Sequence, residues 1–109
     1  VDHQIIHRAT ITAARPEPDN YVKKILCFEI PSSTEWQSTC DPSKFIPNWF
    51  EDITETLDYK IRALNAYENE MRDWPHPRST EAIKSLAKWR GASVGLEAAE
   101  AFMLIKAIN

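Results

Sequence analysis

The sequence predicts a single domain of mixed α/β or α+β class, on three observations. The chain has 109 residues, of which 43% are hydrophobic and 27% charged, as in ordinary globular proteins. Residues 22–30 form one apolar, β-rich run, which is typical of a strand buried on both faces. Segments with helical periodicity surround this run. A buried strand among helices favours a parallel sheet covered by helices, so we expect an α/β sheet.

The first element is predicted to be a helix over residues 2–14. Ile5, Ala9 and Ala13 recur four residues apart, and Asp2 is a suitable residue to cap the helix start. The two prolines of "RPEPDN" end this helix, because proline cannot continue it. The apolar strand follows and ends at Pro31.

The second half is predicted to hold a further extended piece, two helices and a mixed tail. The piece "FIPNWFEDI" is extended, and an apolar stripe from Leu57 to Trp74 then predicts a long helix. "WPHPRS" breaks this helix, Ser79 or Thr80 caps the next one, and Gly91 ends it. The tail is helical by propensity in its Ala/Glu-rich first half, whereas residues 102–108 suit a closing strand.

Composition excludes several classes of function. The net charge of −3 offers no basic face for nucleic acid, and no apolar run approaches the length of a membrane span. The start shows no signal-peptide pattern. Cys27 lies in the apolar run and Cys40 in a polar loop, and one such pair is no disulfide framework. We therefore expect reduced thiols and a cytoplasmic protein.

Asp2, His3 and His7 are the first candidates for chemistry. Histidines four residues apart share one face of a helix, so His3 and His7 could reach one metal ion. The alternative is a polar helix start without a ligand. A catalytic zinc site takes three protein ligands and a water, so these residues alone would be incomplete.

Four further polar residues are candidates for a binding pocket. Glu29 lies near the end of the apolar strand, where open α/β sheets bind ligands, although it could equally be an edge residue or pair with an arginine. His76 and Arg78 lie in the proline-rich "PHPRS" turn, which could be a surface connector. Glu100 lies between "AA" and "AF", where a solvated helix face is the alternative.

Three tryptophans carry predictions about packing. Trp74 and Trp89 fit the apolar stripes of their helices and are expected in the core. Trp36 lies in the polar "SSTEWQS" loop, where we expect it to seal a pocket or an interface.

Four stretches, taken in order, resemble one protein family. They are "VDHQIIHRATITAARP", "CFEIPSSTEW", "FIPNWFEDITETLDYKIRALNAYENEMR" and "PHPRSTEAIKSLAKWRGASVGLEAAEAF". Together they cover nearly the whole chain and resemble the C-terminal half of LmbE-like proteins, in the N-acetylglucosaminyl-phosphatidylinositol de-N-acetylase (PIG-L) superfamily. The resemblance implies a partial Rossmann-like sheet with flanking helices, as the C-terminal portion of a larger α/β deacetylase domain.

The resemblance also implies a zinc-dependent hydrolase that removes the acetyl group of an N-acetylglucosamine-type amide. In that family an early His-Pro-Asp-Asp-Glu loop and a later Asp-His pair supply the zinc site. By the match of "VDH", His3 is the implied zinc ligand and Asp2 the neighbouring catalytic residue. On this basis we expect Glu29, His76, Arg78 and Glu100 to line the pocket that faces the sugar of a small N-acetyl sugar conjugate, or to lie directly behind its lining.

The sequence departs from the family pattern because it contains no His-Pro-Asp-Asp-Glu. His3 would be one ligand of three, so we expect the chain to be inactive by itself. Two alternatives stay open. The chain could be a non-catalytic fragment that self-associates as a homo-oligomer, because half a sheet leaves an unpaired edge. It could also be a small HxxxH metal-binding module.

Overall fold

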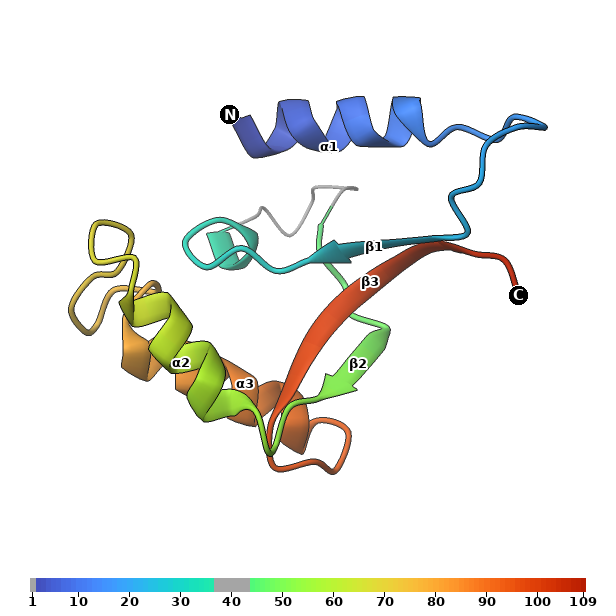
Figure 1. The fold of residues 1–109 in the computed structure, drawn as a ribbon. Helices are drawn as coiled ribbons and strands as arrows, with labels where there is room; N and C mark the ends of the chain where they lie inside the picture. Colours follow the sequence, from blue (N-terminus) through green and yellow to red (C-terminus); the bar gives the residue numbers. More distant parts are fainter. Residues whose placement is uncertain (1, 37–43) are drawn as a thin grey trace.

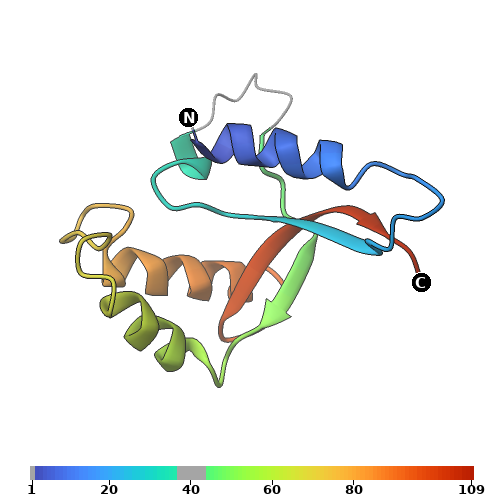
Figure 2. The ribbon, with the colours of Figure 1, turned by 45° about the horizontal axis from the view of Figure 1, so that its top comes forward.

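A computed structural model describes residues 2–36 and 44–109. It is a mixed α/β structure in which a small sheet lies between helices (Figure 1). One helix, α1, lies on one side of the sheet, and α2 and α3 lie together on the other (Figure 2). In chain order the elements are α1 (Asp2–Ala13), β1 (Lys24–Phe28), the 3-10 turn η1 (Thr34–Trp36), β2 (Trp49–Asp52), α2 (Leu57–Asn65), α3 (Thr80–Ala92) and β3 (Ala99–Ala107).

The described sheet has three strands in the order β1-β3-β2, and both neighbouring pairs are antiparallel. The central strand β3 places Phe102 opposite Phe28 of β1 and opposite Trp49 of β2. The predicted parallel sheet is therefore wrong for the described part of the chain. The apolar run indicated burial but not strand direction, and the last strand of the sequence enters between the first two and runs opposite to both.

β1 is shorter and more exposed than the sequence predicts. It spans Lys24–Phe28, with half-buried residues at its centre and exposed residues at its ends. One edge of β1 pairs with β3, and no other described strand lies along its second edge. The prediction of a strand buried on both faces is wrong because the described chain supplies too few partners to cover this run.

α2 and α3 pack against each other, and α3 packs against β3. Their buried contacts come from Ile61 of α2 and from Ile83 and Ala87 of α3. Gly91 is buried inside the last turn of α3, where the expected helix stop is displaced by one residue to Ala92. The chain then turns at Gly95, whose φ of 81° suits glycine, and enters β3.

α2 ends at Asn65, well before the predicted end at Trp74. Turns follow it: the Tyr67 N–H donates to the Leu64 carbonyl and the Glu70 N–H to the Tyr67 carbonyl, each at 3.0 Å. Trp74, which the stripe assigned to the core, is exposed. Apolar residues at steps of three also suit successive turns with i to i+3 hydrogen bonds, so the periodicity overestimated the helix.

The tail forms a strand over its whole apolar length. β3 begins at Ala99, so the closing strand is confirmed and the helical first half is wrong from that residue onward. Ala99 and Ala101 are buried, and in the sheet they pair with Asp52 and Phe50 of β2. Pairing with β2, joined by β1 from Phe102 onward, overrides the helical propensity of the Ala/Glu-rich run.

α1 confirms the predicted N-terminal helix but is hardly packed. Residues 3–13 are all exposed, including Ile5 and Ile6, and α1 packs against none of the other described helices or strands. Neither α1 nor any other helix in the described ranges combines the length and apolar character that a membrane crossing needs.

The buried core is small and consists mainly of alanine. The accessible surface is 8477 Å², against about 6,200 Å² expected for a monomer of this mass. The radius of gyration is 15.5 Å, against about 13 Å for a compact domain of this length. Both values are larger than those expected of a compact domain of this length. The buried apolar residues are Ala14, Ile61, Ile83, Ala87, Ala98, Ala99 and Ala101.

Ser79 provides a test of how α3 begins. Its buried Oγ accepts a hydrogen bond from the Ala82 N–H at 3.0 Å, as the predicted cap requires. Ser79→Ala should lower the free energy of unfolding by about 1 kcal/mol, because an N-terminal amide loses its partner. Urea denaturation measures this change. Ser85→Ala, at an exposed position of the same helix, is the control; equal midpoints for the two variants would contradict the capping role.

Candidate functional site

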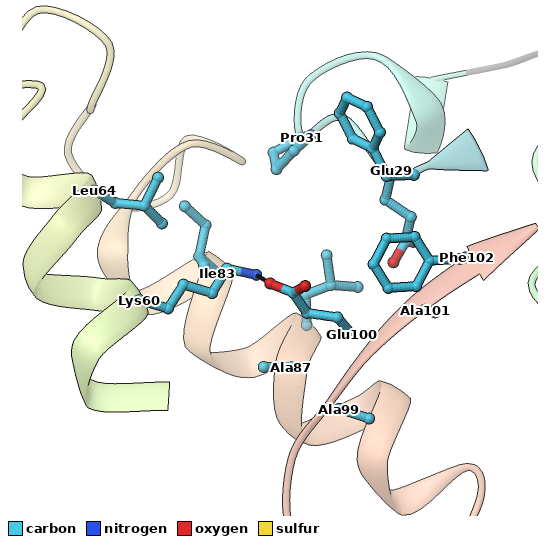
Figure 3. A pocket seen from close by; sticks show the side chains of 12 residues that line it. Glu29, Pro31, Lys60, Leu64, Ile83, Ala87, Ala99, Glu100, Ala101 and Phe102 are labelled. Atoms are coloured by element: carbon cyan, nitrogen blue, oxygen red, sulfur yellow. Dashed lines mark ion pairs between the residues drawn. The ribbon is translucent and has the colours of Figure 1, made fainter. Parts of the chain in front are cut away.

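A cavity of about 440 Å³ lies between α2, α3 and β3, beside the turn that follows β1 (Figure 3). Its volume falls within the range of small-molecule sites, about 300–1,000 Å³. Its larger apolar lining residues are Phe28, Pro31, Leu64, Ile83, Leu86 and Phe102. They come from four separate segments, so only the folded chain forms this cavity.

Glu29 directly follows β1, lines the cavity and is held by Arg90 of α3. Arg90 Nε donates to both carboxylate oxygens at 3.2 Å, and Arg90 Nη2 donates to Oε1 at 2.5 Å. The two side chains are 12% and 22% exposed, so water screens this ion pair only weakly. Glu29 therefore lines a cavity, as expected, and it is also paired with an arginine, which was the alternative interpretation.

Glu100 also lines the cavity, but from a strand. The alternative interpretation of the sequence was that Glu100 lies on a solvated helix face. The structure instead places Glu100 in β3, opposite Glu51 of β2. Lys60 Nζ of α2 lies 2.7 Å from Glu100 Oε1, as the dashed line in Figure 3 shows. Both side chains are about one third exposed, so the pair balances charge and adds little stability.

Lys60 and Arg90, the partners of the two carboxylates, were not predicted from the sequence. Each lies on a helix among other charged residues, and no spacing rule connects them to their carboxylates. Arg90 is 61 positions away from Glu29 along the chain. The one available signal was that a carboxylate near a buried strand could need an arginine, without an indication of which one.

His76 and Arg78 do not line this cavity; they lie in the segment between α2 and α3. The Arg78 N–H donates to His76 Nδ1 at 3.0 Å, and Arg78 Nη1 lies 3.2 Å from Glu70 Oε2. These contacts stay within the segment itself. The geometry therefore suits the alternative of a surface connector, and it separates these two residues from Glu29 and Glu100.

His3 and His7 are exposed on α1, at the spacing that the sequence predicts. α1 runs antiparallel to β1, so its first turn points toward the end of the molecule at which β1 ends and Glu29 follows (Figures 1 and 2). Among the described residues, no group of three or more His, Cys, Asp or Glu side chains could hold a metal ion. These residues by themselves do not fit a zinc ion. The side chain of Asp2 lies outside the described part.

Cys27, Trp36 and Trp89 do not line the cavity. Cys27 is a free, half-buried cysteine whose burial raises the pKa of its thiol, and Cys40 lies outside the described residues. Trp89 is exposed, so its predicted core position is wrong: it lies on the side of α3 away from Ile83 and Ala87. Trp36 is 88% exposed and seals no pocket among the described residues.

Asp52 gives a prediction about pH. Its Oδ1 accepts hydrogen bonds from the Thr54 hydroxyl at 2.5 Å and from the Thr54 N–H at 2.9 Å. The hydroxyl bond, and then the amide bond, hold the pKa of Asp52 below its usual value. A lowered pKa in the folded state means that this contribution to stability is present above the unfolded pKa. It is lost as the pH falls through the folded pKa.

Thr54→Val should therefore raise the pKa of Asp52, which an NMR titration of its carboxyl carbon measures. Thr56→Val is the control, because the Thr56 hydroxyl donates to the Ile53 carbonyl and not to Asp52. Equal Asp52 titrations in the two variants would contradict the hydrogen-bond assignment.

The chain was compared with protein-family models, with curated proteins and with solved structures, and none of the three comparisons found a match.

Proposed function

We propose that this chain is the C-terminal portion of a zinc-dependent N-deacetylase of the LmbE-like (PIG-L) superfamily, acting on an N-acetylglucosamine-type amide. The supporting observation is that Glu29 and Glu100, two of the residues expected to face the sugar, line one cavity. Carboxylates accept hydrogen bonds from sugar hydroxyl groups. His3 belongs to the first turn of α1, and α1 begins on the side of the molecule at which β1 ends (Figure 1). The same proposal places the protein in the cytoplasm and makes the three antiparallel strands one edge of a larger Rossmann-like sheet.

The large exposed surface supports the idea of a portion of a larger domain. The excess over a compact monomer is about 2,300 Å², whereas a standard protein interface takes about 800 Å² from each partner. Ile5 and Ile6 of α1 and the second edge of β1 belong to this uncovered surface. In the proposal, further strands of the same domain extend the sheet at β1 and cover α1.

The same proposal makes the chain inactive by itself. His3 would be one of three zinc ligands, and the sequence contains no His-Pro-Asp-Asp-Glu to supply the others. One imidazole on an exposed helix neither fixes a metal ion nor orients its water. Under this proposal the residues of this chain alone support no catalytic step.

A zinc titration of the 109-residue chain by calorimetry tests this part of the proposal. We expect no tight, stoichiometric binding, because a single ligand is too few. Tight binding of one zinc per chain that disappears in His3→Ala would contradict it. His7→Ala is the matched control: an equal loss in both variants would favour the independent HxxxH module.

A second candidate function is self-association, which the open sheet edges favour. β1 and β2 each have one edge without a neighbouring described strand, and such edges template pairing with a second copy. Under this alternative the chain would be a non-catalytic homo-oligomer. Size-exclusion chromatography with light scattering tests it: a mass of one chain across the concentration range contradicts self-association.

A further inference from the structure

The cavity between α2, α3 and β3 has a wall that selects for one kind of ligand group. Phe28 and Phe102 are directly opposite each other in the β1–β3 register, and both line the cavity. Cross-strand neighbours have Cβ atoms about 5 Å apart, so Phe28 and Phe102 present their side chains to the same part of the cavity, which we call its aromatic wall. Leu64 of α2 and Ile83 of α3 face the same open space (Figure 3). A flat or chain-like apolar group fits between these surfaces.

The charges at the cavity are balanced. The Glu100 carboxylate is paired with Lys60, and the Glu29 carboxylate is paired with Arg90. An anionic ligand would have to displace a carboxylate from Lys60 or Arg90, and a cationic one would compete with the same two cations for the carboxylates. The cavity therefore favours an uncharged ligand. Each carboxylate has about four acceptor positions and keeps capacity for a hydroxyl or amide N–H of that ligand.

We infer that this cavity binds the uncharged aryl or alkyl aglycone of a sugar conjugate. The inference rests on the proposed function for the sugar, and on the cavity itself for the apolar group. The aglycone packs against Phe28 and Phe102, and the hydroxyls next to it donate to Glu29 or Glu100. Conjugates whose aglycone is a phosphate or a nucleotide are disfavoured, because Lys60 and Arg90 are already paired and the cavity offers no surplus positive charge to hold that group. The substrate class is thus a neutral aryl or alkyl N-acetylglucosaminide.

The exposed position of Phe28 allows a clean variant. Its side chain is 63% exposed, so Phe28→Ala removes one of the two rings of the wall without leaving a hole in the core. Trp89→Ala is the matched control, because Trp89 is an equally exposed aromatic residue that does not line the cavity.

The experiment measures binding to the 109-residue chain by NMR titration, with phenyl β-D-glucoside, phenyl N-acetyl-β-D-glucosaminide and N-acetylglucosamine 1-phosphate as probes. We expect both phenyl compounds to bind and to shift the cavity residues, and the phosphate to bind at least about 10-fold more weakly. Phe28→Ala should weaken phenyl binding by about 3- to 10-fold, in line with the loss of one aromatic contact. Trp89→Ala should change it by less than 2-fold.

Two results overturn the inference: phosphate binding as tight as phenyl binding, or phenyl binding that is absent or unaffected by Phe28→Ala. The glucoside carries no acetyl group, so its binding does not depend on deacetylation. Phenyl binding without acetate release by the intact protein would overturn the proposed function alone. Acetate release without any contribution from the phenyl group would overturn the cavity inference alone.

Discussion

Gly91→Ala is expected to lower the free energy of unfolding by about 3 kcal/mol, at the upper end of the range for overpacking. A Cβ at this position would lie 2.6 Å from the Leu96 carbonyl oxygen and 2.8 Å from the Ala98 N and Cα. These are backbone atoms and cannot rotate away. The Leu96 N–H also donates to the Gly91 carbonyl at 2.8 Å, so this close approach fixes how the chain passes from α3 into β3. Urea denaturation followed by circular dichroism measures the loss.

Ala92→Gly is the matched control, one residue further along and exposed. Its cost should be about 1 kcal/mol or less, from helix propensity alone. Propensity by itself would make Gly91→Ala stabilising, so the two explanations differ in sign. A Gly91→Ala variant as stable as the wild type would show that α3 and the segment leading into β3 do not approach this closely.

Arg90→Leu is expected to lower the free energy of unfolding by about 2–3 kcal/mol. It leaves the Glu29 carboxylate, which is 12% exposed, without its ion-pair partner. Breaking a fully buried pair costs about 3–5 kcal/mol, and the residual exposure of both side chains reduces this figure. The pair also joins the end of β1 to α3, two elements that are far apart in sequence, so the loss should loosen β1 first.

A double-mutant cycle separates the ion pair from the packing of the two side chains. Glu29→Met combined with Arg90→Leu removes both charges, and we expect it to regain most of the stability lost in Arg90→Leu. The readout is the coupling free energy from four urea curves. Strictly additive losses would mean that Glu29 and Arg90 do not act as a pair.

Local signals in the sequence predicted the elements that have local causes. The prolines after residue 15 and the cap at Ser79 set the ends of α1 and the start of α3, because backbone restriction and capping act within a few residues. The extended piece around Trp49 is confirmed as β2. These features depend on no distant partner.

The incorrect predictions concern features that depend on contacts between residues far apart in the sequence. The direction of β3, and its strand form from Ala99 onward, depend on pairing with β1 and β2 on either side. The same limitation explains why Trp74 and Trp89 are exposed. An apolar stripe becomes buried only where another part of the chain covers it. Trp74 lies in turns and Trp89 on the uncovered side of α3.

The candidate site was predictable in its carboxylates but not in its cations. Glu29 and Glu100 stood out because each interrupts an apolar environment, and the fold brings both to one cavity. Lys60 and Arg90 carry no such signal on their helices. The proline-rich turn drew attention to His76 and Arg78, yet loop stiffness does not determine which way a loop faces.

The central claim, that this chain completes a zinc-dependent deacetylase through His3, is tested most directly by acetate release. The assay uses the polypeptide translated from the intact reading frame that contains this sequence, with a panel of neutral N-acetylglucosaminides. We predict zinc-dependent release of acetate that falls at least about 100-fold in His3→Ala. Mutating a residue that only hydrogen-bonds to a metal ligand lowers activity about 10- to 100-fold, and removing the ligand itself should lower it further. A folded intact protein that releases no acetate from any of these compounds, or as much acetate in His3→Ala as in the wild type, would contradict the claim.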